Sequence, residues 1–201
     1  MKTVLFYIIL FVGLINVTQA QKPKMHLKVR FGGQINNYVE KRDSIKTDNY
    51  GGFQGGFSFR LIHKKRMFEV GFDFVRNYVD FTLAKPNPNN YQLQLNSFEI
   101  PLTSGFLTYK NRYFRHFLYG GFVTKFHVKS LYYTKGSNQP QVLKPKQSTL
   151  RNPHFSFRFG TQFDIYMFNF DVNYSIGLNN ATKNTFRVQS HNLNFIVGVL
   201  F

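Results

Sequence analysis

The chain has 201 residues, with 26 Lys and Arg against 9 Asp and Glu, and a formal net charge of +17. It contains no cysteine, which excludes disulfides, thiolate metal sites and lipoprotein attachment. The length suits a single domain, and 25 Phe and 12 Tyr give it a large aromatic content although its mean hydropathy is negative.

The first twenty residues have the form of a secretory signal peptide. Lys2 is a positive n-region, residues 4–15 form an apolar h-region, and a small-residue motif ends at Ala20. The apolar run is shorter than the ~20 residues that a spanning helix needs. We therefore expect residues 1–20 to be cleaved and residues 21–201 to form one exported domain. Export argues against nucleic acid as the partner of the positive charge, and favours lipid phosphates, lipopolysaccharide and acidic glycans.

After the signal, apolar residues recur at every second position, which is typical of β-strands with one apolar face. Five strands are regular: residues 27–35, 53–61, 68–74, 155–165 and 170–176. A further strand places Leu118, Gly120, Phe122, Phe126 and Val128 on one face and Tyr119, Lys125 and His127 on the other.

The strand around residues 92–102 is irregular. Its apolar parity changes between Leu95 and Phe98, so we predict a β-bulge with one extra residue near Asn96 and Ser97. Pro101 lacks a backbone donor and fits poorly in a paired strand.

The last strand alternates as far as the terminal aromatic residue. A C-terminal strand that ends in Phe resembles the signal by which Gram-negative bacteria recognise outer-membrane barrels, so Phe195, Val197, Val199 and Phe201 are the predicted insertion signal. The last strand of a soluble sandwich would show the same alternation.

Long and short connections alternate between the eight strands. The long ones are residues 40–52, 82–91, 130–153 and 178–190, and the short ones are residues 63–66, 110–112 and 166–167. Outer-membrane barrels have this asymmetry, with short periplasmic turns and longer external loops. In hydrocarbon the strands must also close on themselves. We predict an all-β fold, an eight-stranded antiparallel closed transmembrane β-barrel, whose interior is filled by side chains.

Several of these strands resemble the PorT-like family of outer-membrane β-barrel proteins. The similar segments are residues 95–103, 117–122, 174–178 and 195–201. These motifs are strand patterns, so the resemblance implies a fold and a compartment. The family is named after a protein needed for a secretion system, and most members have no assigned activity.

Charged residues on the polar faces are expected to meet inside the barrel. Arg60 and Glu69 flank a short turn symmetrically, which places them opposite one another in a hairpin. Paired carboxylates serve as general acid and base in some enzymes, but a structural ion-pair network fits a narrow lumen better. The predicted network comprises Arg30, Arg60, Glu69, Asp73, Glu99, Arg158, Asp164 and Asp171, with Lys28 beside them on the same polar face.

The segment His154-Phe-Ser156 resembles the His-x-Ser pair of outer-membrane lipid A deacylases. No Glu follows on this strand or on the next one, and Asp164 lies ~25 Å from Ser156 at ~3.3 Å per residue. Nucleophilic catalysis needs closer groups, so we predict no catalytic residue, and no metal or cofactor site.

Basic residues concentrate in the connections. Lys64, Lys65, Arg66, Lys110 and Arg112 in the short turns are predicted to contact lipid phosphates, although ordinary solvated charge is the simpler interpretation. Lys41, Lys144 and Arg187 in the long links have the same interpretation towards lipopolysaccharide.

The expected function is therefore non-enzymatic: a structural or adhesion-type outer-membrane barrel, or an accessory subunit of a cell-envelope assembly. Its expected partners are outer-membrane lipids and lipopolysaccharide, the barrel-assembly machinery during insertion, and an envelope protein that the sequence does not identify. The alternatives are an outer-membrane lipid-modifying enzyme and a soluble exported barrel that binds a ligand in its lumen.

Overall fold

The computed structural model describes residues 23–40, 45–48, 50–83, 90–134, 141–143, 151–180 and 188–201. The predicted signal peptide lies outside these residues. Ten strands follow one another along the described chain: β1 (Lys24–Glu40), β2 (Ile45–Asp48), β3 (Tyr50–His63), β4 (Arg66–Leu83), β5 (Asn90–Lys110), β6 (Phe114–Thr134), β7 (Gln141–Leu143), β8 (His154–Ile165), β9 (Phe168–Gly177) and β10 (Val188–Leu200). In these parts of the chain no helix has the length and apolarity needed to cross a membrane.

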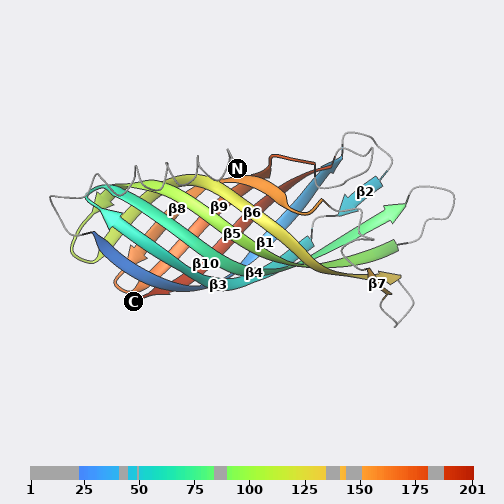
Figure 1. Ribbon diagram of the computed structural model, residues 1–201, viewed down its shortest axis with the longest axis horizontal. Coiled ribbons are helices and arrows are strands. Elements are labelled where there is room, and N and C mark those ends of the chain that lie inside the picture. The colour runs from blue at the N-terminus through green and yellow to red at the C-terminus, as the bar shows by residue number, and fades with distance from the viewer. Residues whose placement is uncertain are drawn as a thin grey trace, which may run out of the picture.

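Eight of the strands form a closed antiparallel ring, in the order β4, β3, β1, β10, β9, β8, β6 and β5 (Figure 1). Pairing of β1 with β10 joins the two ends of the chain, from Lys28 opposite Leu200 to Glu40 opposite Val188. Pairing of β4 with β5 completes the circle. The predicted fold, an eight-stranded antiparallel closed barrel, is confirmed.

The long connections are shorter than predicted, because three strands continue past the rest of the barrel. β4 reaches Leu83, β5 begins at Asn90 and β6 reaches Thr134, so the predicted link over residues 82–91 begins and ends within strands, and the predicted link over residues 130–153 begins within β6. Figure 1 shows these extensions on the right, beside the short strands β2 and β7. β2 pairs with β4, and β7 pairs with β6. Backbone pairing between neighbouring strands thus persists where the polar sequence predicted loops.

The predicted irregularity in β5 is present, but the extra residue is on its neighbour. Asn96 lies opposite Lys129 and Ser97 opposite His127, which leaves Val128 of β6 without a partner. β5 itself keeps continuous pairing with β4 across Asn96 and Ser97. Leu95 therefore lies on the same face of β5 as Ser97, and both side chains are buried. The prediction that the apolar face of β5 changes sides between Leu95 and Phe98 is wrong.

Pro101 lies inside a paired strand, contrary to the prediction. It is opposite Val123 of β6, so that side of the ladder is intact. On the other side the register between β4 and β5 passes from Val70–Leu102 to Asp73–Glu99, without a pair at Pro101. The missing backbone donor interrupts the ladder on one side only.

The two faces of the barrel wall have opposite chemistry. Outside the irregular part of β5, the predicted apolar positions point outward and the predicted polar positions point into the lumen, where Lys, Arg, Glu, Asp, Asn and Gln side chains are buried. Each ring strand contributes exposed large apolar side chains, among them Phe31, Phe57, Phe72, Leu102, Phe122, Phe159, Phe170 and Phe195. This is the reverse of a water-soluble domain, whose apolar side chains form its interior.

Candidate functional site

Glu69 is the centre of the charged lumen. Its carboxylate lies 2.6 Å from Lys28 Nζ, 3.1 Å from Arg30 Nη1 and 2.7 Å from Arg60 Nε. Ser58 Oγ donates a further hydrogen bond at 2.9 Å. The register places Arg60 directly opposite Glu69, as the symmetry of the short turn predicts. Three cations and a hydroxyl therefore satisfy one buried carboxylate.

One ion pair crosses the whole lumen from β3 to β8. Arg60 Nη1 of β3 lies 2.9 Å from Asp164 Oδ1 of β8, and these strands are diametrically opposite in the ring of eight. Arg115 Nη2 of β6 approaches the same carboxylate at 3.1 Å. Because both guanidinium groups meet Asp164 inside the barrel, the pair blocks the lumen rather than lining a channel.

Two further carboxylates are paired in the same way. Arg30 contacts Asp73 through Nε and Nη2, at 2.7 Å each, which is the bidentate geometry that guanidinium groups favour. Glu99 accepts Lys125 Nζ at 2.7 Å and Arg158 Nη2 at 2.7 Å.

Asp171 is satisfied by neutral donors. Tyr119 Oη donates to it at 2.7 Å, Gln162 Nε2 at 3.0 Å and Asn173 Nδ2 at 3.0 Å. It makes no ion pair among the described residues, whereas the other seven predicted network residues do.

Small residues make room for this network. A Cβ atom at Gly71 of β4 would collide with the guanidinium of Arg30. The cavity that remains, bounded partly by Arg30, Glu69 and Arg158, measures about 10 Å³, space for about one water molecule. The filled lumen offers no room for a small-molecule ligand at this level.

The structure places all eight predicted network residues in the lumen, with Lys28 beside them as predicted, and adds Arg115 and Lys125 as charged partners. Arg115 was missed because the predicted apolar face of its strand began at Leu118, three residues later. Extending the alternation of Tyr119 backwards by two and four positions reaches Phe117 and Arg115, both of which point inward.

Among the described residues, no side-chain hydrogen bond joins His154 to Ser156. Both are buried on the lumen side of β8, and the hydrogen bond of His154 is a 3.4 Å contact between Nε2 and Ser190 Oγ of β10. Asp164 is at the opposite end of β8, bound to Arg60 and Arg115. Within the described residues, no group of three or more His, Asp or Glu could hold a metal ion.

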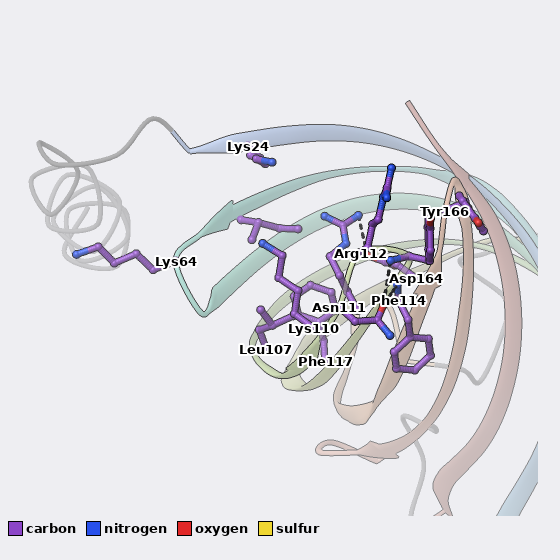
Figure 2. A pocket seen from close by; sticks show the side chains of 13 residues that line it. Lys24, Lys64, Leu107, Lys110, Asn111, Arg112, Phe114, Phe117, Asp164 and Tyr166 are labelled. Carbon is purple, nitrogen blue, oxygen red and sulfur yellow. Dashed lines mark hydrogen bonds and ion pairs between the residues drawn. The ribbon is translucent and has the colours of Figure 1, made fainter.

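The short turns surround a pocket of about 440 Å³ at one mouth of the barrel, which we call the turn-side pocket (Figure 2). It gathers three of the five basic residues predicted to contact phosphates, Lys64, Lys110 and Arg112, whereas Lys65 and Arg66 do not line it. Lys24 at the start of β1 joins them, a residue that sequence patterns did not single out. Lys41, Lys144 and Arg187 of the long links lie outside the described residues.

An apolar cluster of Ile62, Met67, Phe117 and Tyr119 lies beside this pocket, whose lining also includes the ion-paired Arg115 and Asp164. Ile62 and Phe117 also line the pocket, and the guanidinium carbon of Arg60 lies 5.6 Å from the centre of the Phe117 ring. The pocket thus has an apolar floor below a basic rim.

The predicted insertion signal lies on the outer surface of β10. Phe195, Val197 and Phe201 are exposed and Val199 is half-buried. Phe201 exchanges backbone hydrogen bonds of 2.8 and 3.2 Å with Leu27 of β1. The terminal residue is therefore part of the seam that closes the barrel.

No protein-family model matches the chain, and no curated protein matches it. Among solved structures, it is similar to the attachment invasion locus protein Ail of Yersinia pestis, in complex with the heparin analogue sucrose octasulfate. The identity is 14% over 89% of this chain and 99% of that chain, with a TM-score of 0.49.

Neisserial surface protein A is 13% identical over 90% of this chain and 100% of that one, with a TM-score of 0.46. LpxR from Salmonella typhimurium is 8% identical over 88% of this chain and 100% of that one, with a TM-score of 0.32. Likenesses this low carry no argument about the activity of this barrel, and membership of the PorT-like family stays a prediction.

Proposed function

We propose that this chain is a small integral outer-membrane protein of the PorT-like type, exported through a cleaved signal peptide. Its role is non-enzymatic, either structural or adhesion-type, or as an accessory subunit of a secretion-related envelope assembly. The observation that carries the proposal is the wall itself: apolar side chains cover the outside of all eight ring strands, while buried charges fill the inside. Hydrocarbon is the solvent that such an outer face fits.

The arrangement of the ends supports an orientation in the membrane. β1 begins and β10 ends on the side of the short turns, so this side faces the periplasm and the extended strands β4, β5 and β6 face outward. Tyr109, Tyr113 and Tyr166 are exposed at the turn side, where an interfacial aromatic belt is expected. Outer-membrane lipids and lipopolysaccharide then surround the wall, and the barrel-assembly machinery reads the last strand during insertion.

The lumen supports a non-enzymatic role. Ion pairs occupy its centre, and Arg60 with Asp164 crosses it completely. A pore is therefore not part of the proposal, and neither is an apolar ligand held in the lumen. Function then resides at the two ends of the barrel and on its outer wall.

Heat modifiability tests the location and the closed fold together. The membrane fraction is extracted in detergent and run on SDS gels with and without boiling. We expect a faster band in the unboiled sample that is lost on boiling, because a closed barrel resists SDS. A single unshifted band, with the protein in the soluble fraction, would overturn the proposal in favour of a soluble exported barrel.

A further inference from the structure

The turn-side pocket is built from parts of the chain that are distant in sequence. Lys64 from the β3–β4 turn, Lys110 and Arg112 from the β5–β6 turn, and Tyr166 from the β8–β9 turn all line it. In Figure 2 Lys110, Arg112 and Tyr166 lie near one another, and Lys64 extends from the tip of the β3–β4 turn. Lys24 completes the rim from β1. Four separate segments thus contribute to a volume of about 440 Å³, within the range of small-ligand sites.

A second β-bulge directs Lys110 towards this opening. The register between β5 and β6 shifts between Leu107, opposite Phe117, and Tyr109, opposite His116, so Thr108 is the extra residue. A bulge reverses the alternation of the residues that follow it. Leu107 and Lys110 consequently both line the pocket although regular alternation would place them on opposite faces.

Backbone hydrogen bonds hold the rim in place. Leu107 N donates to Lys65 O at 2.7 Å, and Tyr166 N donates to Tyr113 O at 3.0 Å, so neighbouring turns are tied together. Asn111 Oδ1 accepts from the backbone of Tyr113 at 2.9 Å and of Phe114 at 2.7 Å, which fixes the turn between β5 and β6. The cations therefore sit on a preorganised frame, which lowers the cost of ordering a ligand.

The charges of the pocket are not balanced. Lys24, Lys64, Lys110 and Arg112 form no ion pair with any described carboxylate, and the acidic residue that lines the pocket, Asp164, is already bound to Arg60 and Arg115. One carboxylate ligand would neutralise only one of these four cations. A phosphate group carries about −1.5 to −2 charges and accepts hydrogen bonds from several donors at once.

We infer that the turn-side pocket binds a compact phosphate-bearing anion with two or more negative charges, such as a diphosphate or a phosphomonoester. The basic rim contacts the phosphate oxygens, and the floor of Ile62, Leu107 and Phe117 receives an apolar part of the ligand. The anion comes from a phospholipid headgroup that carries a phosphomonoester or two phosphates, or from a soluble phosphorylated compound. That the pocket opens to the periplasm rests on the proposed function, whereas binding by the purified barrel does not.

The experiment titrates pyrophosphate into the purified mature barrel in a zwitterionic detergent and measures heat by calorimetry. The pocket variant is Lys64→Ala with Arg112→Ala. The matched control is Lys65→Ala with Arg66→Ala, which removes the same charge from exposed turn residues that do not line the pocket. We expect about tenfold weaker binding, or more, in the pocket variant and less than about a twofold change in the control. This outcome supports the inference with a soluble phosphate as the source.

A second measurement tests whether the ligand of the pocket is a phospholipid. Phosphorus NMR detects phospholipid that stays bound to the barrel through purification. Lipid retained by the wild type and the control but lost from the pocket variant supports the same site with a headgroup as its ligand, even where pyrophosphate does not bind. Absence of both ligands, or equal losses in the two variants, overturns the inference.

Every sample is also run as an unboiled SDS gel. A heat-modifiable band shows that a variant is folded, so lost binding is not lost structure. A wild-type protein that binds pyrophosphate but is recovered from the soluble fraction would contradict the proposed location and leave the pocket intact.

Discussion

The centre of the lumen and the turn-side pocket use the same residue types in opposite ways. In the centre, Glu69, Asp73 and Glu99 meet Lys and Arg partners within 3.1 Å, and all of these side chains are buried. At the mouth, Lys24, Lys64, Lys110 and Arg112 form no ion pair with a carboxylate in the part of the chain that the structure describes. Burial makes pairing obligatory, because an unpaired charge in a low-dielectric interior is costly, and exposure removes that requirement. Charge in the centre therefore serves the fold, while charge at the mouth is left for a ligand.

Substitution of Glu69 is the strongest test of the difference between the centre of the lumen and its mouth. Glu69→Gln keeps the side-chain shape but leaves Lys28, Arg30 and Arg60 with a neutral partner. We expect the free energy of unfolding to fall by about 3–5 kcal/mol, as for other buried pairs that lose one member. Guanidinium unfolding in phospholipid vesicles, followed by circular dichroism, measures it. Lys65→Gln on the exposed turn should stay within about 0.5 kcal/mol of the wild type. A loss below about 1 kcal/mol at Glu69 would mean that the network is not structural.

The outer wall gives the next largest effect. Phe122 is 59% exposed, near the middle of the barrel wall, between Leu102 and Phe157. Phe122→Lys should destabilise the protein in vesicles by about 2–4 kcal/mol, because it places a charge near the bilayer midplane. Met25→Lys, at a position 72% exposed near the turn side, should cost about 0–1 kcal/mol. Equal costs at the two depths, or a neutral Phe122→Lys, would argue that the wall does not face lipid.

The wall and the adjacent ion pair could be predicted from the sequence because both depend on local rules. Period-2 alternation fixes which side chains face in or out, and hairpin symmetry about a short turn sets Arg60 opposite Glu69. These rules operate within one strand or between two consecutive strands. They require no knowledge of how the ring closes.

The contacts across the lumen could not be predicted in this way. Arg60 meets Asp164 only because the ring contains eight strands with a particular stagger, and a strand pattern does not state the stagger. The turn-side pocket depends likewise on the bulge at Thr108 and on turns that meet after closure. Alternation locates the irregularity near Asn96 and Ser97 but does not show that β6 carries the extra residue, and it gives no sign of the bulge at Thr108.

Two lysine substitutions, one at the mouth and one in the lumen, are expected to have smaller effects on the free energy of unfolding. Lys110→Ala should change the free energy of unfolding by less than about 0.5 kcal/mol, with slight stabilisation at low salt where the mouth cations repel one another. At about 1 M salt, where the screening length is ~3 Å, that stabilisation should disappear. Lys125→Ala removes a buried partner of Glu99 and should cost at least about 1 kcal/mol at either salt concentration. If the loss of unfolding free energy in Lys125→Ala depended on salt, Lys125 would behave like the exposed cations of the mouth and not like a buried partner of Glu99.

The smallest effect is expected from substitutions at the loop-side end of the lumen. His154 lies there and is buried, like the residues of the centre, rather than exposed like those of the mouth. Its Nε2 contacts Ser190, both side chains are buried, and the carboxylate of Asp164 is bound at the far end of β8. A nucleophile and its base must be within hydrogen-bond reach of each other and of substrate, and lipid lies on the other side of this wall. Expression of the protein should therefore leave the number of acyl chains on lipid A unchanged in mass spectra, for the wild type, His154→Ala and Ser156→Ala alike. Loss of one acyl chain with the wild type, restored by His154→Ala while the variant remains heat-modifiable, would instead make the barrel a lipid-modifying enzyme and give these buried side chains a catalytic role.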